Sequence, residues 1–266
     1  SPSSSRRFST SSMEKPTLNI LISNDDGIFA RGLEILEEAC RGVGDVTVVA
    51  PDREQSAASH ALTMTRPLRP VKRSDGRYQV DGTPTDCVLL ALETILDAPP
   101  DIIFSGINHG SNMGEDVLYS GTVAAAMEGL SVGIPGVAFS FAGGKIELIE
   151  THAEWVAKIA CDICRVDDFP RETLLNVNLP PIPGPEVKGI RVTKLGRRVY
   201  SDSLTRMNDP WGRDMFWIGG GKSRWSGDEE SDFRAVAEGY ISVTPLHLDL
   251  TQYDHIDMVR SWNLGA

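Results

Sequence analysis

The sequence predicts an α/β fold in which a mostly parallel sheet carries helices on both faces. Two patterns indicate this fold. Strand-like runs of apolar and β-branched residues alternate with helix-like segments between residues 17 and 180. These runs are apolar on both sides, as strands of a parallel sheet are when helices cover both faces. With 266 residues, 41% of them hydrophobic, the chain can bury one large core.

The expected elements begin with a strand at Leu18–Ser23 and a helix at Gly32–Cys40 whose apolar residues share one face. Thr83 can cap a later helix, Pro84 suits its first position, and Asp86 lies in its first turn. The other expected elements are, in order, a buried strand at Asp45–Ala50, a hairpin at Leu68–Val80, the helix from Thr83 to Leu96, a strand at Asp101–Ser105, a helix at Thr122–Leu130, a strand at Gly136–Ser140, a long helix at Ile146–Cys164 and a strand at Leu174–Leu179.

The pattern changes after residue 180. Ile190–Leu195 and Gly239–Leu248 are expected to be strands, and the segment between them is rich in tryptophan and charge. A hairpin of this composition is unstable alone, so we expect its aromatic residues to dock on the body or on another subunit. The acidic run Asp228–Asp232 is expected to be a solvated loop tip. We divide the chain into 1–16, a disordered, targeting or upstream segment; 17–180, the main domain; and 181–266, C-terminal strands, an arm and a terminal helix that pack on it.

The net charge of −11 argues against a nucleic-acid duplex or an anionic membrane surface as a partner. No apolar run approaches the roughly 20 residues that a membrane helix needs. The four cysteines form no disulfide framework, so we expect a reducing compartment, the cytoplasm. An organelle is the alternative if the serine-rich residues 1–12 are the remnant of a transit peptide.

The first candidates for chemistry are Asp25 and Asp26, two adjacent carboxylates at the end of the first strand. Two free anions cannot share one buried site, because like charges at this distance repel. A divalent cation between them removes the conflict, and hard oxygen ligands suit Mg²⁺ or Mn²⁺. The alternative is an Asp-Gly turn whose acids are merely solvated. This motif alone is compatible with both interpretations.

Two other strand ends carry polar residues that can converge with this pair. Asp52 follows the second strand, Ser56 lies in the loop beyond it, and the strand Asp101–Ser105 leads to Asn108. The carboxyl ends of parallel strands meet at one edge of the sheet, where ligands bind. Two carboxylates, a hydroxyl and an amide oxygen, completed by water, make a reasonable shell for a hard cation. Spacing alone does not choose between Asn108 and Asn112.

The loop Gly106–Gly121 predicts a phosphate site beside this metal site. Its glycines allow close backbone approach, and Ser120, Gly121 and Thr122 lead directly into a helix. Free N–H groups and the dipole at a helix start favour a phosphate, and two hydroxyls add donors. Simple capping of the helix by Ser120 is the alternative. The loop matches neither a Walker loop nor a dinucleotide fingerprint.

Five blocks of this chain resemble the SurE family of survival-protein nucleotidases and acid phosphatases. The blocks are ILISNDDGIFARGLEIL, VTVVAPDREQSAASHALT, GTPTDCVLLAL, PDIIFSGINHGSNMGEDVLYSGTVAAAMEG and GYISVTPLHLDLT, which span 18–251 in the family's order. The resemblance implies a Rossmann-like domain with a smaller C-terminal part used in dimer and tetramer contacts. It also implies a phosphomonoesterase that depends on a divalent metal and acts on nucleoside 5′- and 3′-monophosphates.

The same resemblance assigns roles to individual residues. The family's metal ligands fall on Asp25, Asp26, Ser56 and Asn108, and its phosphate contacts fall on Asn112, Ser120, Gly121 and Thr122. The chain departs from the family pattern at Ala57, where glycine is common. This departure is harmless unless the backbone there requires a positive φ.

In the mechanism expected from these residues, metal-assisted water attacks the phosphate, and Asp25 or Asp26 accepts its proton. His60 is the auxiliary candidate for protonating the leaving group and His109 the second, although a loop histidine without a catalytic role is the simpler interpretation of each. One rival is a phosphatase of the haloacid dehalogenase type, but Asn24 stands where its aspartyl nucleophile belongs. The other rival is a nucleotide-binding regulator without turnover.

Overall fold

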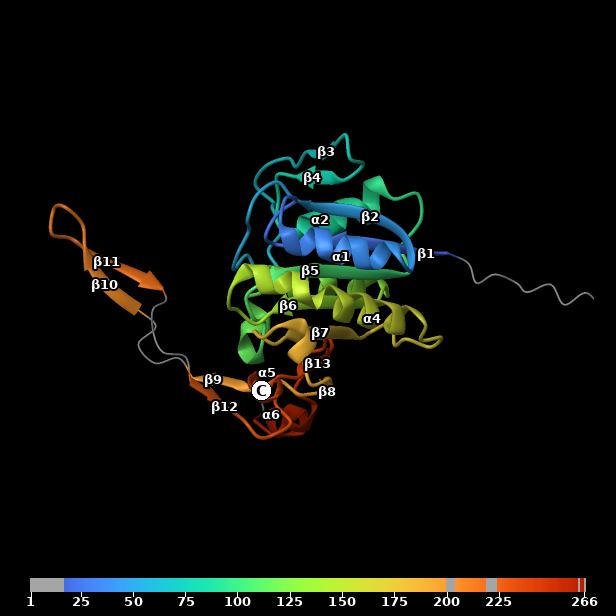
Figure 1. Cartoon of the computed structure of the whole chain (residues 1–266). Helices are drawn as coiled ribbons and strands as arrows, with labels where there is room; N and C mark the ends of the chain where they lie inside the picture. The colour runs from blue at the N-terminus through green and yellow to red at the C-terminus, as the bar shows by residue number, and fades with distance from the viewer. Residues whose placement is uncertain (1–16, 200–203, 219–223, 263, 266) are drawn as a thin grey trace, which may run out of the picture.

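The computed structural model describes residues 17–199, 204–218, 224–262 and 264–265. Figure 1 shows a layered body, with the hairpin β10–β11 standing away from it. The segment 1–16, for which we considered a targeting or upstream role, lies outside the described residues. Among the described helices, none is both long enough and apolar enough to cross a membrane.

A nine-stranded sheet forms the centre of the body, in the order β3-β4-β2-β1-β5-β6-β7-β13-β8. Its strands are β1 Leu18–Ser23, β2 Gly44–Pro51, β3 Pro70–Lys72, β4 Tyr78–Val80, β5 Ile102–His109, β6 Gly136–Phe141, β7 Leu174–Leu179, β8 Ile190–Val192 and β13 Ile241–Leu246. All neighbours from β4 to β7 are parallel, whereas β3 and β13 run antiparallel to β4 and β7. The strand order reverses between β1 and β5, which is where such sheets bind ligands.

Helices cover both faces of this sheet, as predicted. The helices are α1 Arg31–Arg41, α2 Pro84–Leu90, α3 Gly121–Glu128, α4 Ala153–Cys164, α5 Asp232–Ala237 and α6 Ile256–Arg260. One core cluster joins α1 and α4 to one face through residues such as Leu36 and Ile159. Two further clusters join α2 and α3 to the other face through residues such as Val88 and Ala126. The predicted capping of α2 by Thr83 is confirmed, because Thr83 and Asp86 form a reciprocal capping box.

Two predicted helices are interrupted. The helix expected from Thr83 to Leu96 is α-helical only to Leu90 and continues as a short π-helix at Ala91–Ile95. The long helix expected at Ile146–Cys164 is a 3₁₀ segment, Ile146–His152, followed by α4. The second break lies at His152, whose buried ring bonds the carbonyl of Ile182 and packs against Phe141. The ring therefore turns into the body, and a tertiary contact overrides the helical periodicity.

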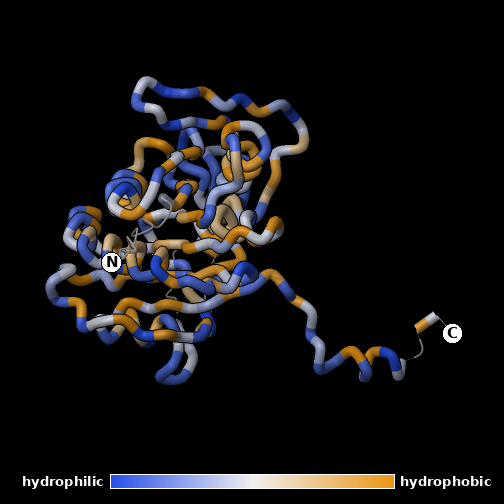
Figure 2. The backbone as a smooth tube through the Cα atoms, turned by 90° about the vertical axis from the view of Figure 1, so that its right-hand side faces the viewer, coloured by the Kyte–Doolittle hydropathy of each residue, from blue (hydrophilic) through white to orange (hydrophobic). Residues whose placement is uncertain are grey.

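The C-terminal part is partly continuous with the main sheet, because β8 and β13 form its last two strands. The arm consists of two small sheets, β10 (Leu204–Asn208) with β11 (Asp214–Ile218), and β9 (Arg197–Val199) with β12 (Arg224–Ser226). Every residue of β10 and β11 is exposed. In Figure 2 the chain beyond β13 also leaves the body, with α6 and the C-terminus at its far end.

The aromatic residues of the arm differ in their surroundings. Trp225 docks on the body as expected, with its ring stacked 5.5 Å from that of Phe233. Trp211 and Trp217 are 79% and 66% exposed, so the body does not cover them.

The expectation that the acidic run Asp228–Asp232 is a solvated loop tip is wrong at its end. Asp232 is fully buried, and its carboxylate is compensated by N–H bonds that it accepts from Gly114 at 2.8 Å and Gly196 at 2.9 Å. Asp228 and its two acidic neighbours are exposed, as expected.

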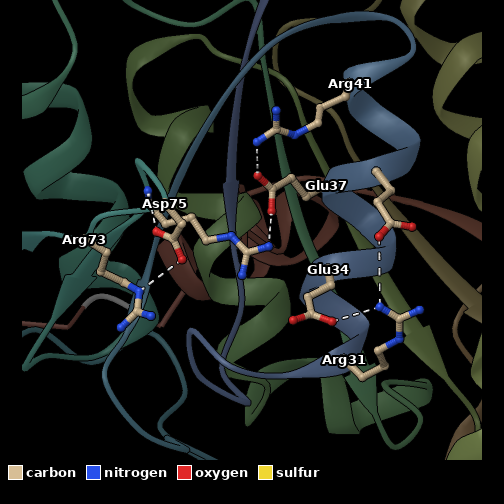
Figure 3. A network of polar contacts seen from close by, with 8 residues as sticks. Arg31, Glu34, Glu37, Arg41, Arg73 and Asp75 are labelled. Atoms are coloured by element: carbon tan, nitrogen blue, oxygen red, sulfur yellow. Dashed lines mark hydrogen bonds and ion pairs between the residues drawn. The ribbon is translucent and has the colours of Figure 1, made fainter.

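A buried carboxylate fastens the β3–β4 hairpin to α1. Figure 3 shows Glu37 of α1 facing Arg41, and the two side chains are 2.6 Å apart. Arg77 from the hairpin lies 2.6 Å from the other oxygen of Glu37, whose side chain is only 4% exposed. Arg73 of the same hairpin lies over the ring of Phe29, three residues beyond Asp26. The hairpin therefore supports the turn that follows the Asp25–Asp26 pair.

Candidate functional site

Asp25 lies at the end of β1, where the strand order reverses, and is buried with 4% exposure. The hydroxyl of Thr122, at the start of α3, donates a hydrogen bond to its Oδ1. The pKa of Asp25 is raised from 3.8 to about 6, mainly by burial, while hydrogen bonds from Thr122 oppose the rise and the charge of Asp26 contributes to it. Burial of Asp25 therefore outweighs the hydrogen bonds that stabilise its charge.

Asp26 is held by the other strand of the switch point. Its Oδ2 accepts the backbone N–H of His109 at 3.0 Å, at the end of β5. Burial raises the pKa of Asp26, this N–H bond opposes the rise, and the charge of Glu54 adds to it. Sequence reasoning missed Glu54, because its closeness to Asp26 depends on the fold of the loop after β2.

The start of α3 packs tightly against Asp25. A Cβ at Gly121 would lie 2.9 Å from the Cβ of Asp25 and 3.1 Å from the Cγ of Pro84, so only glycine fits this position. Ser120 caps the helix, since its Oγ accepts the N–H of Val123 at 3.1 Å. The capping interpretation of Ser120 is thus confirmed, and its hydroxyl proton can still be donated to a ligand.

The loop that carries Ser56 is tied to both the pair and α2. The N–H of Gln55 donates to the carbonyl of Asp25 at 2.7 Å, which places the loop beside the carboxylates. The Ser56 hydroxyl itself donates to Glu54 at 2.6 Å. Further along, Thr83 donates to the carbonyl of Ala61, and Asp86 accepts the N–H of Thr63 at 2.9 Å. The capping box of α2 therefore also anchors this loop.

Ala57, where the chain departs from the family pattern, has φ = 58°. A Cβ in this left-handed region meets the backbone, at a cost of about 1 kcal/mol. We expect Ala57→Gly to raise the free energy of unfolding by roughly 0.5–1 kcal/mol, as measured by chemical denaturation.

Ala58→Gly is the matched control, because Ala58 has no positive φ and gains only backbone freedom. The control should therefore lower stability. Equal destabilisation by both substitutions would show that Ala57 carries no strain.

Asn108 and Asn112 approach each other through Ser140 of β6. Asn108 lies opposite Ser140 in the sheet, and the Nδ2 of Asn112 donates to the Ser140 hydroxyl at 2.8 Å. The Nδ2 of Asn108 donates to the carbonyl of Gly110 at 2.8 Å, so its Oδ1 is the group available for a ligand. Asn108 also precedes His109, whose N–H binds Asp26. Both asparagines thus belong to the edge of the sheet that carries the carboxylate pair.

The two histidines of the neighbouring loops lie in different places. The Nε2 of His60 lies 2.6 Å from Glu128, at the last residue of α3 and away from the helix start that faces Asp25. His109 lies beside Asp26, since its backbone N–H binds that carboxylate.

The donor set fits a hard divalent cation. Asp25, Asp26 and Asn108 offer carboxylate and amide oxygens, and burial has raised the pKa of both acids. No group of three His, Cys, Asp or Glu side chains in the described ranges is arranged to hold a metal ion. An ion here would therefore need amide or hydroxyl oxygens together with the two carboxylates.

Sequence reasoning also missed Asn176 and Asn178 of β7, which bind the backbone of Asn112. A signal was present in the sequence. The strand LLNVNL is apolar except for these two residues, and their spacing of two places both side chains on one face.

Comparison with known proteins gives a consistent result. The sequence profile described as "Survival protein SurE" matches residues 20–202. A protein of Gemmatimonas aurantiaca named 5′-nucleotidase SurE is 60% identical, over 92% of this chain and 98% of its own length. One of the same name from Methylococcus capsulatus is 46% identical over 93% and 98%. The crystal structure of the SurE protein from Aquifex aeolicus superposes with a TM-score of 0.82 at 42% identity, covering 92% of this chain and 99% of that one.

Proposed function

This chain belongs to the SurE family, and we propose that it hydrolyses nucleoside 5′- and 3′-monophosphates to nucleoside and phosphate, with Mg²⁺ or Mn²⁺ as its cofactor. The relatives named 5′-nucleotidase SurE support the nucleotidase activity. The observation that carries the proposal is a pair of adjacent carboxylates, of which Asp25 is buried directly against the start of α3 and Asp26 is half-buried. Such an arrangement suits a cation next to a phosphate group.

Asp25, Asp26 and Asn108 would hold the ion, with Ser56 as the fourth ligand if its hydroxyl turns away from Glu54. When bound, a divalent ion offsets charge on a phosphate oxygen and lowers the pKa of bound water. Thr122 fixes one oxygen of Asp25 and the His109 N–H fixes one oxygen of Asp26, so the orientation of both carboxylates is set in advance. Such preorganisation is a large part of what phosphoryl transfer requires.

The start of α3 would orient the phosphate. The Ser120 hydroxyl and the Gly121 N–H are donors at the positive end of the helix, where anions are favoured. Asn112 adds an amide Nδ2, of which one hydrogen is used by Ser140 and the other can be donated to an oxygen of the substrate. In this structure the Thr122 hydroxyl binds Asp25, so its part in the site is to hold that carboxylate.

Proton transfer would use the same groups. Asp25 or Asp26 can accept the proton of the attacking water, since each keeps one carboxylate oxygen outside the bonds described above. His109 is closer to the pair than His60 and is the better placed of the two to protonate the leaving alkoxide.

The test is release of inorganic phosphate from a panel of 5′- and 3′-nucleoside monophosphates in EDTA, Mg²⁺ and Mn²⁺. We expect release only with a divalent ion, from both kinds of ester. Release in EDTA would contradict the metal dependence, and release from 5′ esters alone would remove the 3′ activity. Binding of AMP without release under any condition would instead identify a nucleotide-binding regulator.

We also propose that the chain forms a homodimer or homotetramer. The exposed apolar residues of β10, β11 and α6 support this, because the body of the same chain does not cover them. Light scattering on the purified protein should give two or four times the mass of the chain. A monomeric mass at micromolar concentration would contradict the proposal.

A further inference from the structure

The geometry points to Asn178 and Asn176 of β7 as positioning residues that hold Asn112 in the orientation a substrate phosphate needs. This inference rests on the proposed function, because it assigns Asn112 to the phosphate site. The hydrogen bonds of both side chains go to the backbone of Asn112 and not to the Asp25–Asp26 pair, so both residues would act through Asn112.

Asn178 binds both backbone groups of Asn112 with a single side chain. Its Oδ1 accepts the Asn112 N–H at 2.9 Å, and its Nδ2 donates to the Asn112 carbonyl at 3.0 Å. A neighbouring strand would offer the same donor and acceptor, so the amide of Asn178 replaces a strand that is missing at this point. Asn176 adds a second donor to the same carbonyl at 2.7 Å.

The side chain of Asn112 is held as well. Its Nδ2 donates to Ser140 at 2.8 Å, and Ser140 lies between Asn108 and Asn178 in the sheet register. Ser140 therefore lies, in the sheet, next to Asn108 of the proposed metal site and next to Asn178 of the clamp, the name used here for the side chains of Asn176 and Asn178. Four hydrogen bonds fix Asn112, and it is only 6% exposed.

The loop needs such a clamp because its own backbone is permissive. Gly110 and Gly114 flank Asn112, both with positive φ, and the segment between them contains no helix or strand.

The clamp also lowers the stability of the sheet. Asn176 and Asn178 are fully buried, and the Oδ1 of Asn176 has no partner. Leucine at either position would suit a strand core better, so the two amides have a reason beyond the stability of the sheet.

The experiment compares Asn178→Leu and Asn176→Leu with Thr244→Val. Thr244 is the matched control, because it lies opposite Asn176 in the sheet, is 2% exposed and shares a hydrogen bond between its hydroxyl and that of Thr193. Three quantities are measured on the full chain: hydrogen exchange in residues 110–120, the affinity of the Mn²⁺-loaded protein for inorganic phosphate, and the affinity for Mn²⁺ itself.

We expect Asn178→Leu to speed exchange in residues 110–120 and to weaken phosphate binding by about tenfold, with Mn²⁺ affinity unchanged within twofold. Asn176→Leu should do the same to a smaller extent, and it decides the matter if Asn178→Leu does not fold. The kcat for nucleotides should fall by 10- to 100-fold in Asn178→Leu, because a displacement of about 1 Å has this effect. Thr244→Val should change none of these quantities.

Equal effects of the clamp variants and Thr244→Val, or parallel losses of Mn²⁺ and phosphate affinity, would overturn the inference, because both outcomes indicate general loosening. The proposed function fails separately. If the wild-type protein releases no phosphate from any ester, hydrogen exchange and phosphate affinity still decide whether the clamp exists.

Discussion

Asp26→Asn is expected to slow phosphate release from nucleoside monophosphates on the order of 10³-fold at saturating Mg²⁺. The substitution removes one of two negative charges that would hold the cation, and a metal ion contributes several kcal/mol to stabilising charge in the transition state. The shape of the site should survive, since the amide oxygen of asparagine can still accept the His109 N–H that now bonds Asp26. The measurement is kcat and KM with a Mg²⁺ titration, beside a thermal unfolding curve.

Asp81→Asn is the control for this substitution. Asp81 is a carboxylate after β4 that pairs with Arg66 and the Arg69 N–H, so the same chemical change is made away from the site. Its turnover should match that of the wild-type protein. If Asp26→Asn retained near-full turnover with metal present, the assignment of the carboxylate pair would be wrong.

In the absence of metal, the charge on Asp25 is expected to destabilise the protein above pH 6. Burial raises the pKa of Asp25 from 3.8 in the unfolded chain to about 6 in the folded protein, so the folded state binds the proton more tightly. The associated stabilisation is fully present below about pH 4 and is lost as the pH rises through about 6. The loss corresponds to about 3 kcal/mol of unfolding free energy.

The comparison that isolates this effect is chemical denaturation of wild type and Asp25→Asn in EDTA, from pH 4 to pH 8. Groups shared by the two proteins cancel, so the difference in unfolding free energy should shift in favour of Asp25→Asn with increasing pH. Mg²⁺ at 100 times its dissociation constant should restore about 2.7 kcal/mol to the wild-type protein and much less to the variant. A difference that stayed constant across the pH range would mean that Asp25 is not desolvated.

These two expectations together describe a site in which function opposes stability. The carboxylate pair includes both Asp26, whose replacement removes the activity, and Asp25, whose charge the metal-free fold tolerates poorly. Buried like charges persist in a protein only where something else compensates them, and here the compensation would come from the ion.

Local patterns in the sequence predicted the limits of elements that depend mainly on neighbouring residues. Both limits of β1 agree with the prediction, because the apolar run ends abruptly just before Asn24 and the two carboxylates. The capping of α2 by Thr83 was also predicted, since Pro84 and Asp86 lie at positions that a helix start favours, and the structure adds the reciprocal bond from Asp86. The convergence of Asp25 with the start of α3 followed from the rule that parallel strands share an edge, and the hydrogen bond from Thr122 to Asp25 agrees with it.

What the sequence could not predict depends on partners distant along the chain. The break at His152 requires the carbonyl of Ile182, and the burial of Asp232 requires the N–H of Gly114. The effect of Ala57 was left open for the same reason, because its φ of 58° is set by the loop as a whole. Periodicity and capping describe one element at a time, and these residues respond to elements that had not yet been placed.

The loop Gly110–Gly121 draws its support from residues that are translated long after it. Asn112 is bound by Asn178, 66 residues later, and Gly114 by Asp232, 118 residues later. Contacts of such separation form slowly, because the intervening chain must first be closed into a loop. A growing polypeptide therefore carries its aspartate pair from the beginning, yet the groups that fix this loop join it only when synthesis has passed residue 232. The order of events in folding thus delays the rigid form of the site until synthesis has passed residue 232.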